Sequence, residues 1–163
     1  MKNKMTNMAL GDLAVVCVSG ERGVFDLAFN LKYSLKEELG LAKSQGLNSI
    51  IFITTFMDKI GFQEDKFVSM VDMLTKKAQA FGFKNELVQV IPASLFDGCN
   101  LLEQRSTLTP WYNGPTLFEA AKSFQTKLTA MRAKQAAMTF KFACSKIFSE
   151  RVATHKRLFG RVV

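Results

Sequence analysis

The sequence has few of the residues that build disulfide frameworks, metal centres and nucleophilic triads. Its 163 residues include three cysteines, Cys17, Cys99 and Cys144, and a single histidine, His155. Zinc sites usually need about four ligands, largely Cys and His, so a His/Cys metal site is not expected, and a Ser-His triad would depend on His155 alone. Few, widely spaced cysteines are typical of a reducing compartment. Because Cys17 lies inside an apolar run, we expect it to be a buried, inert thiol.

Long apolar runs are also missing. No run approaches the roughly 20 residues that a membrane helix needs, and the first residues, MKNKMTNMALGD, lack the apolar core of a secretory signal. We therefore expect a cytoplasmic protein without membrane contact. Hydrophobic residues nevertheless make up 48% of the chain, which suits one compact domain with a real core.

Positive charge is concentrated toward the C-terminus. Residues 121–163 contain ten Lys or Arg and one acid, Glu150, which gives this segment a net charge of +9. The whole chain carries +8, so residues 1–120 together carry −1. A basic end on a neutral body indicates contact with nucleic acid or with an acidic partner. The alternative is a solvated helix face followed by a solubilising tail, and the sequence leaves both open.

Apolar strands alternate with helices along most of the chain. Continuous apolar runs predict strands, the first of them buried on both faces, at residues 13–18, 49–54 and 87–93. Apolar residues at helical spacing predict helices at residues 34–45, from Phe67 to Phe81, and from Thr116 to about residue 135. Capping boxes begin the first and the last of these helices, and a glycine ends the first two. Such alternation predicts a parallel α/β sheet with flanking helices.

Polar elbows follow the second and the third strand. They are Thr55–Asp58, with the sequence TFMD, and Pro92–Asn100, with the sequence PASLFDGCN. Ligands of open α/β sheets bind beyond the carboxyl ends of the strands. Asp58 could accept two hydrogen bonds from the amide–amine edge of guanine, and small polar residues of the second elbow could close over the base. A strand-end aspartate is also an ordinary cap or turn residue, so the residues alone leave both interpretations open.

Four stretches of the sequence carry a family resemblance: LKEELGLAKSQGLNSIIFI, TFMD, IPASLFDGCNL and PWYNGPTLFEA. They resemble, in turn, the T-R-E-H-A-x-L-A-x-x-x-G-V, N-K-M-D, P-x-S-G/A-L-x-G-x-N and P-W-Y-x-G-x-T-L-L-E-A segments of one family. These are the translational GTPases around elongation factor 1-alpha, eukaryotic release factor 3 and the ribosome-rescue GTPase that partners Pelota. The stretch GVFDLAF resembles a loop of the family, and MTFKFACSKIF resembles the first strand of the β-barrel domain that follows.

The resemblance implies a partial P-loop-GTPase-like fold, an α/β parallel sheet with flanking helices and a short β extension at the C-terminus. Residues 1–124 would form the C-terminal half of the GTPase domain. Residues 125–138 would be a helical linker, and residues 139–163 the truncated start of the β-barrel domain. We expect Trp111 and Tyr112 to pack against the helix that begins at Leu117, and stacking on RNA is the alternative.

The resemblance also implies a degenerate guanine site. Asp58 stands at the family's guanine-reading aspartate, Thr55 replaces the asparagine that ties the base to the phosphate loop, and Phe56 replaces the lysine that stacks on the base. The second elbow supplies the remaining positions of the site, Ser94, Leu95 and Phe96. Phenylalanine can stack on a purine, so weak binding of GTP or GDP is one expectation. A turn that keeps only a structural role is the other.

The family's phosphate machinery has no counterpart in these residues. The pattern G-x-x-x-x-G-K-[ST] does not occur in the 163 residues. In the family this loop and the switch elements hold the phosphates and Mg²⁺ and place the attacking water, which is most of the catalysis. We therefore assign no catalytic residue and no metal site, and we expect no GTP hydrolysis by this chain alone.

The strand at residues 13–18 would pair, in the family, with the strand that leads into the phosphate loop. Without that strand its edge is open, and an apolar open edge invites pairing or aggregation. We therefore expect the chain to self-associate, to cover this edge with its own tail, or to be poorly soluble.

Three functions are consistent with the sequence. The first is a translation-factor-related protein of elongation, termination or ribosome rescue, whose partners are a tRNA-like factor and the ribosome, with the basic residues 121–163 on rRNA. The second is a pseudo-GTPase interaction module, comparable to the superkiller-type adaptor that links stalled ribosomes to the exosome. Thr55 and Phe56 favour it, because these substitutions lie inside the chain. The third is a decayed fragment without a selected role.

Overall fold

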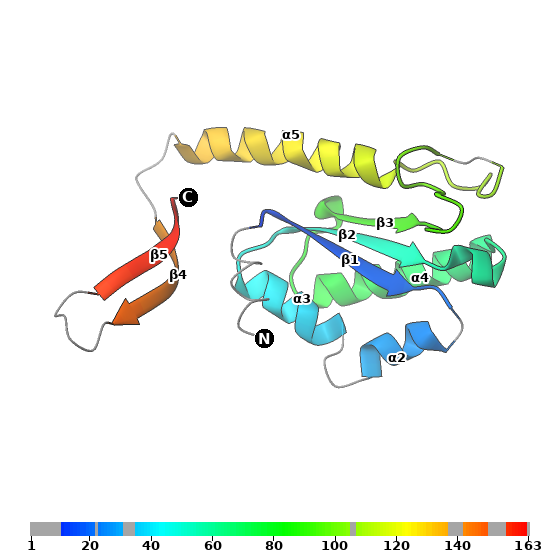
Figure 1. The fold of residues 1–163 in the computed structure, drawn as a ribbon, viewed down its shortest axis with the longest axis horizontal. Coiled ribbons are helices and arrows are strands. Elements are labelled where there is room, and N and C mark those ends of the chain that lie inside the picture. Colours follow the sequence, from blue (N-terminus) through cyan, green and yellow to red (C-terminus); the bar gives the residue numbers. More distant parts are fainter. Residues whose placement is uncertain are drawn as a thin grey trace.

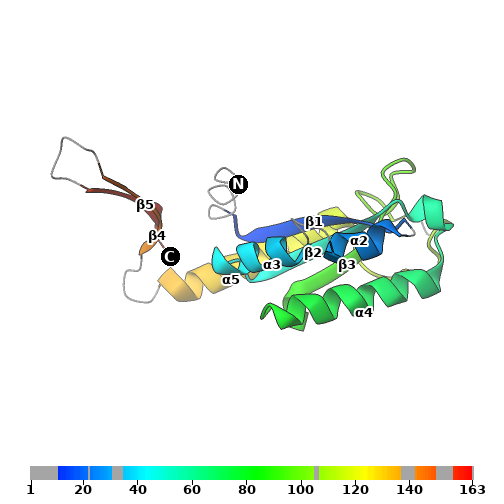
Figure 2. The same cartoon turned by 90° about the horizontal axis from the view of Figure 1, so that it is seen from below.

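A three-stranded parallel sheet lies at the centre of the chain. In this computed structural model the strands stand in the order β1 (Leu13–Ser19), β2 (Ser49–Thr55) and β3 (Val88–Pro92) (Figures 1 and 2). The structure describes residues 11–21, 23–30, 35–104, 107–136, 142–149 and 156–162. The predicted α/β fold with parallel strands and flanking helices is therefore confirmed.

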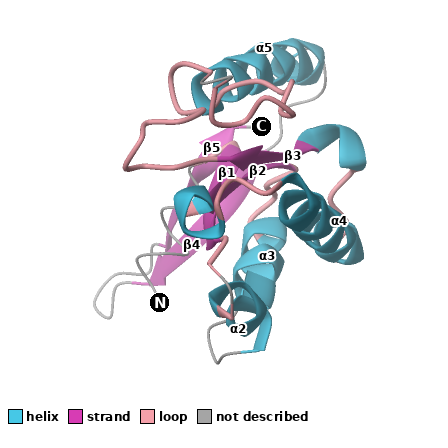
Figure 3. Cartoon of the chain, turned by 90° about the vertical axis from the view of Figure 1, so that its right-hand side faces the viewer, coloured by secondary structure: helices cyan, strands magenta, loops and turns pink. Residues whose placement is uncertain are grey.

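Helices cover both faces of the sheet. One face carries α2 (Val24–Asn30), α3 (Leu35–Ser44) and α4 (Glu64–Ala80). The other carries α5 (Leu117–Ala136), as Figure 3 shows from the end of the sheet. Two short 3-10 turns, η1 (Met57–Ile60) and η2 (Asn85–Leu87), flank α4. The fold thus has three layers.

The central strand β2 joins two hydrophobic cores. Every residue of β2 is buried. Because successive side chains of a strand point to opposite faces, Ile50 and Phe52 lie in the core formed with α3 and α4, and Ile51 and Ile53 lie in the core with α5. Its register is parallel on both sides, with Ile50 opposite Ala14 of β1 and Val88 of β3. This is the pattern expected of a continuous apolar run in a parallel sheet.

The predicted helix ends are present where the structure describes them. At the end of α3, Gly46 has a φ of 85°, its N–H donates to Lys43 O at 3.0 Å, and the N–H of Leu47 donates to Ala42 O at 3.1 Å. The two bonds form a Schellman motif. The capping box expected at the start of α3 involves Ser34, which lies outside the described residues.

The capping box at the start of α5 forms as expected. The N–H of Glu119 donates to Thr116 Oγ1 at 3.2 Å, and the N–H of Thr116 donates to Glu119 Oε2 at 2.9 Å. Two N–H groups at the helix start are satisfied in this way. The expected linker at residues 125–138 begins inside α5, which continues to Ala136.

The burial of strand β1 differs from the prediction. It is covered on one face only: Ala14 and Val18 are buried, whereas Val15 is 48% exposed and Cys17 is an exposed free thiol. The reason is the position of α5, which packs on β2 and β3 and leaves the outer part of this face open. The prediction that the strand is buried on both faces, with an inert buried Cys17, is therefore wrong.

The edge of β1 has no strand partner among the described residues other than β2. The C-terminal strands β4 (Phe142–Ser149) and β5 (Lys156–Val162) pair with each other, antiparallel, as a separate two-stranded sheet. The expected β extension is thus present, and its two strands do not extend the main sheet. Self-association through the β1 edge stays a prediction.

Two further features complete the fold. The stretch GVFDLAF, expected to be a loop, contains the helix α2. Among the described residues, no helix combines the length and the hydropathy that crossing a membrane requires.

Candidate functional site

The elbow after β2 is held by its own backbone and by one buried hydroxyl. Thr55 is buried, and its Oγ1 donates to the carbonyl oxygen of Val18 at the end of β1 at 3.3 Å. Phe56 follows in the left-handed conformation, with φ 58° and ψ 34°, and its side chain is exposed. A phenylalanine at positive φ is uncommon and strained. The elbow therefore turns its aromatic ring to solvent and uses its threonine inside the sheet.

The elbow after β3 lies directly beside it. The N–H of Ala93 donates to Thr54 O at 2.8 Å, and the N–H of Met57 donates to Ala93 O at 3.4 Å. These bonds bring the Ser94 hydroxyl to 3.2 Å from Asp58 Oδ1. Side chains from positions 36 residues apart in the sequence thus meet at the carboxyl edge of the sheet, which is where ligands of open α/β sheets bind.

The Ser94 hydroxyl stands between two carboxylates. It lies 2.8 Å from Asp97 Oδ2 and 3.2 Å from Asp58 Oδ1, and it also accepts the N–H of Asp97 at 3.3 Å. A hydroxyl has one proton to donate. The shorter contact favours Asp97 as the acceptor, and the half-buried Asp58 keeps oxygen lone pairs for an external amide or amine donor.

The remaining positions of the expected site point outward. The side chains of Leu95 and Phe96 are both exposed. Phe56, Leu95 and Phe96 therefore expose apolar side chains on the two elbows that carry Asp58 and Ser94. Among the described residues, no three His, Cys, Asp or Glu side chains gather as metal ligands.

Asn100, for which the sequence predicts no role, anchors the loop between β3 and α5. It is fully buried, and its Nδ2 donates to Pro92 O at 2.9 Å and to Thr109 Oγ1 at 3.2 Å. Its backbone carbonyl oxygen accepts the N–H of Leu117 at 3.0 Å, and its φ is 57°. Asparagine tolerates this conformation better than most residues. Asn100 thus ties the end of β3 to the start of α5 and supports the elbow that carries Ser94.

Trp111 packs in a different place from the one predicted. Its ring lies against Phe67 of α4, with centroids 5.2 Å apart, and its Nε1 donates to Phe62 O at 2.9 Å. Tyr112 contacts the same Phe67 ring edge-on at 6.0 Å and borders the core that contains Leu117. The expected packing against the helix that begins at Leu117 therefore holds for Tyr112 only, because Trp111 turns toward α4.

The Tyr112 hydroxyl is a fixed donor. It donates to Pro115 O at 2.9 Å. Burial, with a smaller contribution from the negative charge of Glu119, raises the pKa of Tyr112 well above its ordinary value. The phenol therefore stays neutral and keeps this hydrogen bond at any physiological pH.

Replacing Gly114 by alanine should destabilise this turn. A Cβ at Gly114 would lie 2.5 Å from both Cζ and the hydroxyl oxygen of Tyr112, so the ring must move out of the core. We expect the free energy of unfolding to fall by roughly 1–3 kcal/mol, measured by urea denaturation. Gly40→Ala, inside α3, is the matched control, because its Cβ would meet only Phe81 at 3.4 Å. It should leave stability unchanged or raise it by up to about 1 kcal/mol, and an equal loss in both variants would contradict the prediction.

Comparison with known proteins places the chain in a family. No protein-family model matches the sequence. The chain is 37% identical over 125 residues to elongation factor 1-alpha 2 of Euplotes crassus, a match that covers 77% of the chain and 28% of that protein. It is 34% identical over 126 residues to elongation factor 1-alpha of Hyperthermus butylicus, with 76% and 28% covered. The chain is a relative of the translational GTPases. It spans just over a quarter of the length of these curated relatives.

Solved structures agree with this relationship at the level of the fold. Sup35 complexed with GDP superposes on the chain with a TM-score of 0.61 at 23% identity. The match covers 93% of this chain and 36% of Sup35. The GTPase-like domain of S. cerevisiae Ski7 bound to GTP superposes with a TM-score of 0.58 at 15% identity, over 98% and 37%. Both neighbours carry guanine nucleotides in those structures.

Proposed function

We propose that the chain is a translation-factor-related, GTPase-like protein that acts in elongation, termination or ribosome rescue and does not hydrolyse GTP by itself. The observation that carries the proposal is the paired elbow. Asp58 and Ser94 lie 3.2 Å apart at the carboxyl edge of the sheet, in a chain related to elongation factor 1-alpha. The absence of a G-x-x-x-x-G-K-[ST] pattern in its 163 residues removes the groups that would hold the phosphates.

Asp58 with Thr55 and Phe56, and Ser94 with Leu95 and Phe96, form in this proposal a degenerate guanine site. Asp58 would accept the amide and amine of the base, and Phe56 would stack on it. Thr55 would position the elbow and not touch the ligand, because its hydroxyl donates to the carbonyl oxygen of Val18 inside the sheet. Because this site offers few contacts to the base and none to the phosphates, we expect it to bind GDP and GTP weakly.

A second candidate is a pseudo-GTPase module that binds partners and uses no nucleotide. The conformation of the first elbow favours it. Phe56 holds a strained left-handed conformation and exposes its ring, and strain kept at an exposed position is typical of functional sites. In this version the ring contacts a ribosomal or exosome-linked partner, and nucleotide affinity is lost.

Titration with a fluorescent GDP analogue tests the base site. We expect a dissociation constant of roughly 0.1 mM or weaker, about −5.5 kcal/mol, without dependence on Mg²⁺, because phosphate contacts are missing. Asp58→Ala should remove any preference for the guanine over the adenine analogue. Asp97→Ala is the matched control, since it removes the other carboxylate on Ser94. Tight Mg²⁺-dependent binding, or equal effects of the two variants, would contradict this assignment.

The basic C-terminal part supplies the proposed contact with rRNA. Residues 121–163 carry a net charge of +9, and Lys122 and Lys127 are exposed on α5. The side chains of the residues after 130 lie outside the described part. Clustered lysines neutralise phosphates and release counterions, so binding falls as salt rises.

Reversing charge on α5 should weaken ribosome association. We expect Lys122→Glu with Lys127→Glu to reduce the affinity for purified ribosomes by roughly tenfold or more near physiological salt, with a shallower salt dependence, measured by co-sedimentation. Lys36→Glu with Lys59→Glu changes the net charge equally at exposed positions of α3 and η1. If this control lost as much affinity, the contact would reflect net charge and the assignment to α5 would be wrong.

A further inference from the structure

Strand β1 is an outer strand of the main sheet, and half of its backbone groups face the open edge. Figure 2 shows β1 at the margin of the sheet, and no described strand other than β2 pairs with it. The N–H of Gly20 donates to Thr55 O at 2.7 Å, and Val18 O accepts the Thr55 hydroxyl. The even-numbered residues of β1 thus point their backbone groups at β2, and alternate residues of a strand point theirs to opposite sides. The outward-facing backbone groups therefore belong to Leu13, Val15, Cys17 and Ser19.

This edge lacks the features that usually keep an edge strand from pairing. The seven residues of β1, LAVVCVS, include no charged residue and no proline. Proteins commonly protect an edge with charge, with proline or by keeping the strand short. The opposite edge of the sheet, β3, has five residues and ends in Pro92, which has no N–H to donate to a further strand. Of the two edges, β1 is therefore the one suited to receive another strand.

The face of β1 on the side of α5 is open as well. Val15 is 48% exposed and Cys17 is exposed, whereas Ala14 and Val18, on the other face, are buried. An occupant of this surface needs outward backbone groups at every second residue, apolar side chains beside Val15 and Cys17, and no charge. Strand β1 of a second copy has all three properties, because these are the properties of the surface itself.

We propose that two copies of the chain pair through β1, antiparallel, about a two-fold axis at Val16. This register aligns all seven residues of the strand, with Val15 opposite Cys17 of the second copy and Leu13 opposite Ser19. In an antiparallel pair such opposed residues exchange both of their backbone hydrogen bonds, so every outward-facing group gains a partner. The exposed Val15 and Cys17 side chains become cross-strand neighbours, and the two-fold axis closes the assembly as a dimer.

The dimer leaves both proposed functional surfaces free. A two-fold axis that exchanges neighbouring antiparallel strands stands perpendicular to the joined sheet, so the α5 helices of both copies lie on the same face. Lys122 and Lys127 of the two copies are thereby gathered on one side of the dimer. The elbows that carry Asp58 and Ser94 follow β2 and β3, and they stay open in each copy. The pairing itself does not rest on the nucleotide or the ribosome contact.

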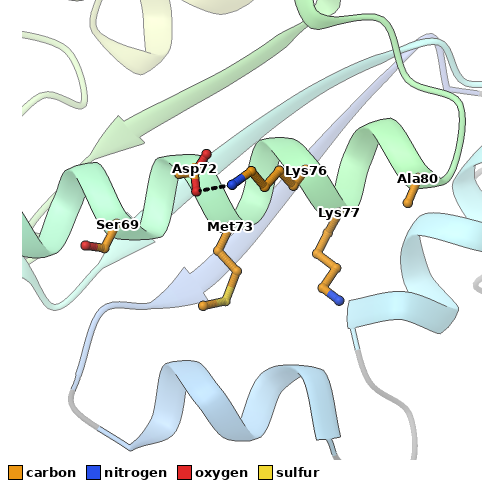
Figure 4. Close-up of a pocket in the computed structure, with 6 residues that line it drawn as sticks. All are labelled: Ser69, Asp72, Met73, Lys76, Lys77 and Ala80. Atoms are coloured by element: carbon orange, nitrogen blue, oxygen red, sulfur yellow. Dashed lines mark hydrogen bonds and ion pairs between the residues drawn. The ribbon is translucent and has the colours of Figure 1, made fainter.

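Analytical ultracentrifugation of the 163-residue chain tests whether it dimerises through β1. We expect a reversible dimer with a dissociation constant of roughly 0.1 mM or tighter. Val15→Lys should weaken the dimer by roughly tenfold or more, because it places charge in the apolar contact of both copies. Met73→Lys is the matched control, since Met73 is 38% exposed in the hollow of α4 on the other face of the sheet (Figure 4). It should leave the dimer unchanged, with circular dichroism confirming that both variants fold.

Cysteine cross-linking tests the register. Opposed residues that are not hydrogen-bonded in an antiparallel pair have Cα atoms about 4.5 Å apart, which a disulfide can bridge. Because Val16 faces Val16 of the second copy, Val16→Cys should give a disulfide-linked dimer on mild oxidation, in a background with Cys17→Ser and Cys144→Ser. Val15→Cys in the same background is the control. It faces the serine at position 17 of the second copy, and it should remain monomeric on a non-reducing gel.

Hydrogen exchange shows whether another segment covers the edge instead. The amides of Val15 and Cys17 should exchange slowly in the dimer and fast after dilution to the monomer. Protection of these amides in a monomer would mean that another part of the chain pairs with β1. That result, a chain that stays monomeric at millimolar concentration, equal losses in Val15→Lys and Met73→Lys, or cross-linking that does not favour Val16→Cys over Val15→Cys would each overturn the proposal.

Discussion

Replacing Phe124 by alanine should lower the free energy of unfolding by about 3–5 kcal/mol. The Phe124 side chain is 2% exposed and lies in the core with Ile51, Ile53 and Ile91. Apart from Ala120, it is the one fully buried side chain of α5 within residues 117–130. Its loss leaves a cavity between α5 and the sheet, so the helix that carries the basic residues should also detach more easily from the sheet.

Phe118→Ala is the matched control, because Phe118 sits on the same helix and is 59% exposed. It should change stability by no more than about 0.5 kcal/mol. Urea denaturation followed by circular dichroism measures both variants, and hydrogen exchange of α5 shows whether the helix loosens. Similar losses for the two variants would mean that α5 does not depend on this one anchor.

Replacing Asn100 by alanine should cost about 2–4 kcal/mol of stability. The substitution removes two hydrogen bonds, to Pro92 O and Thr109 Oγ1, and leaves the carbonyl of Pro92 buried without this donor. It also places alanine at a φ of 57°, a conformation that favours glycine and asparagine. The elbow that carries Ser94 should loosen together with the loop.

Asn100→Gly separates the two causes of this loss. Glycine adopts a φ of 57° freely and lacks the amide, so this variant keeps only the hydrogen-bond part of the effect. We expect a loss in Asn100→Gly that is smaller than in Asn100→Ala by about 1 kcal/mol, both measured by urea denaturation. If Asn100→Ala were as stable as the wild type, the loop would be held by other contacts.

The sequence predicts the elements of this fold because their signals are local. Thr116 and Glu119 mark the start of α5, and a glycine after each of α3 and α4 marks the helix end, through hydrogen bonds within a few residues. The burial of β1 depends on a distant element. A run of apolar residues has the same sequence pattern whether one or both faces of the strand are covered. Only the path of α5 determines that Val15 and Cys17 stay exposed.

The candidate site, like the fold, could be predicted from the sequence only in part. That two elbows meet at one edge follows from the parallel sheet, and Asp58 and Ser94 are indeed adjacent; whether they read guanine stays a prediction. The left-handed conformation of Phe56 could not be predicted, because phenylalanine seldom adopts it. The role of Asn100 could not be predicted either, since its partners, Pro92 and Thr109, meet it only after the loop folds.

Association with purified ribosomes in the presence of GTP, GDP or no nucleotide tests the central claim most directly. If the chain is a translation-related protein without nucleotide chemistry of its own, it should co-sediment with ribosomes to the same extent in all three conditions, and it should release no phosphate from GTP. Association that requires GTP, or GTP hydrolysis above that of ribosomes alone, would contradict the account. Absence of any association would contradict the link to the ribosome itself.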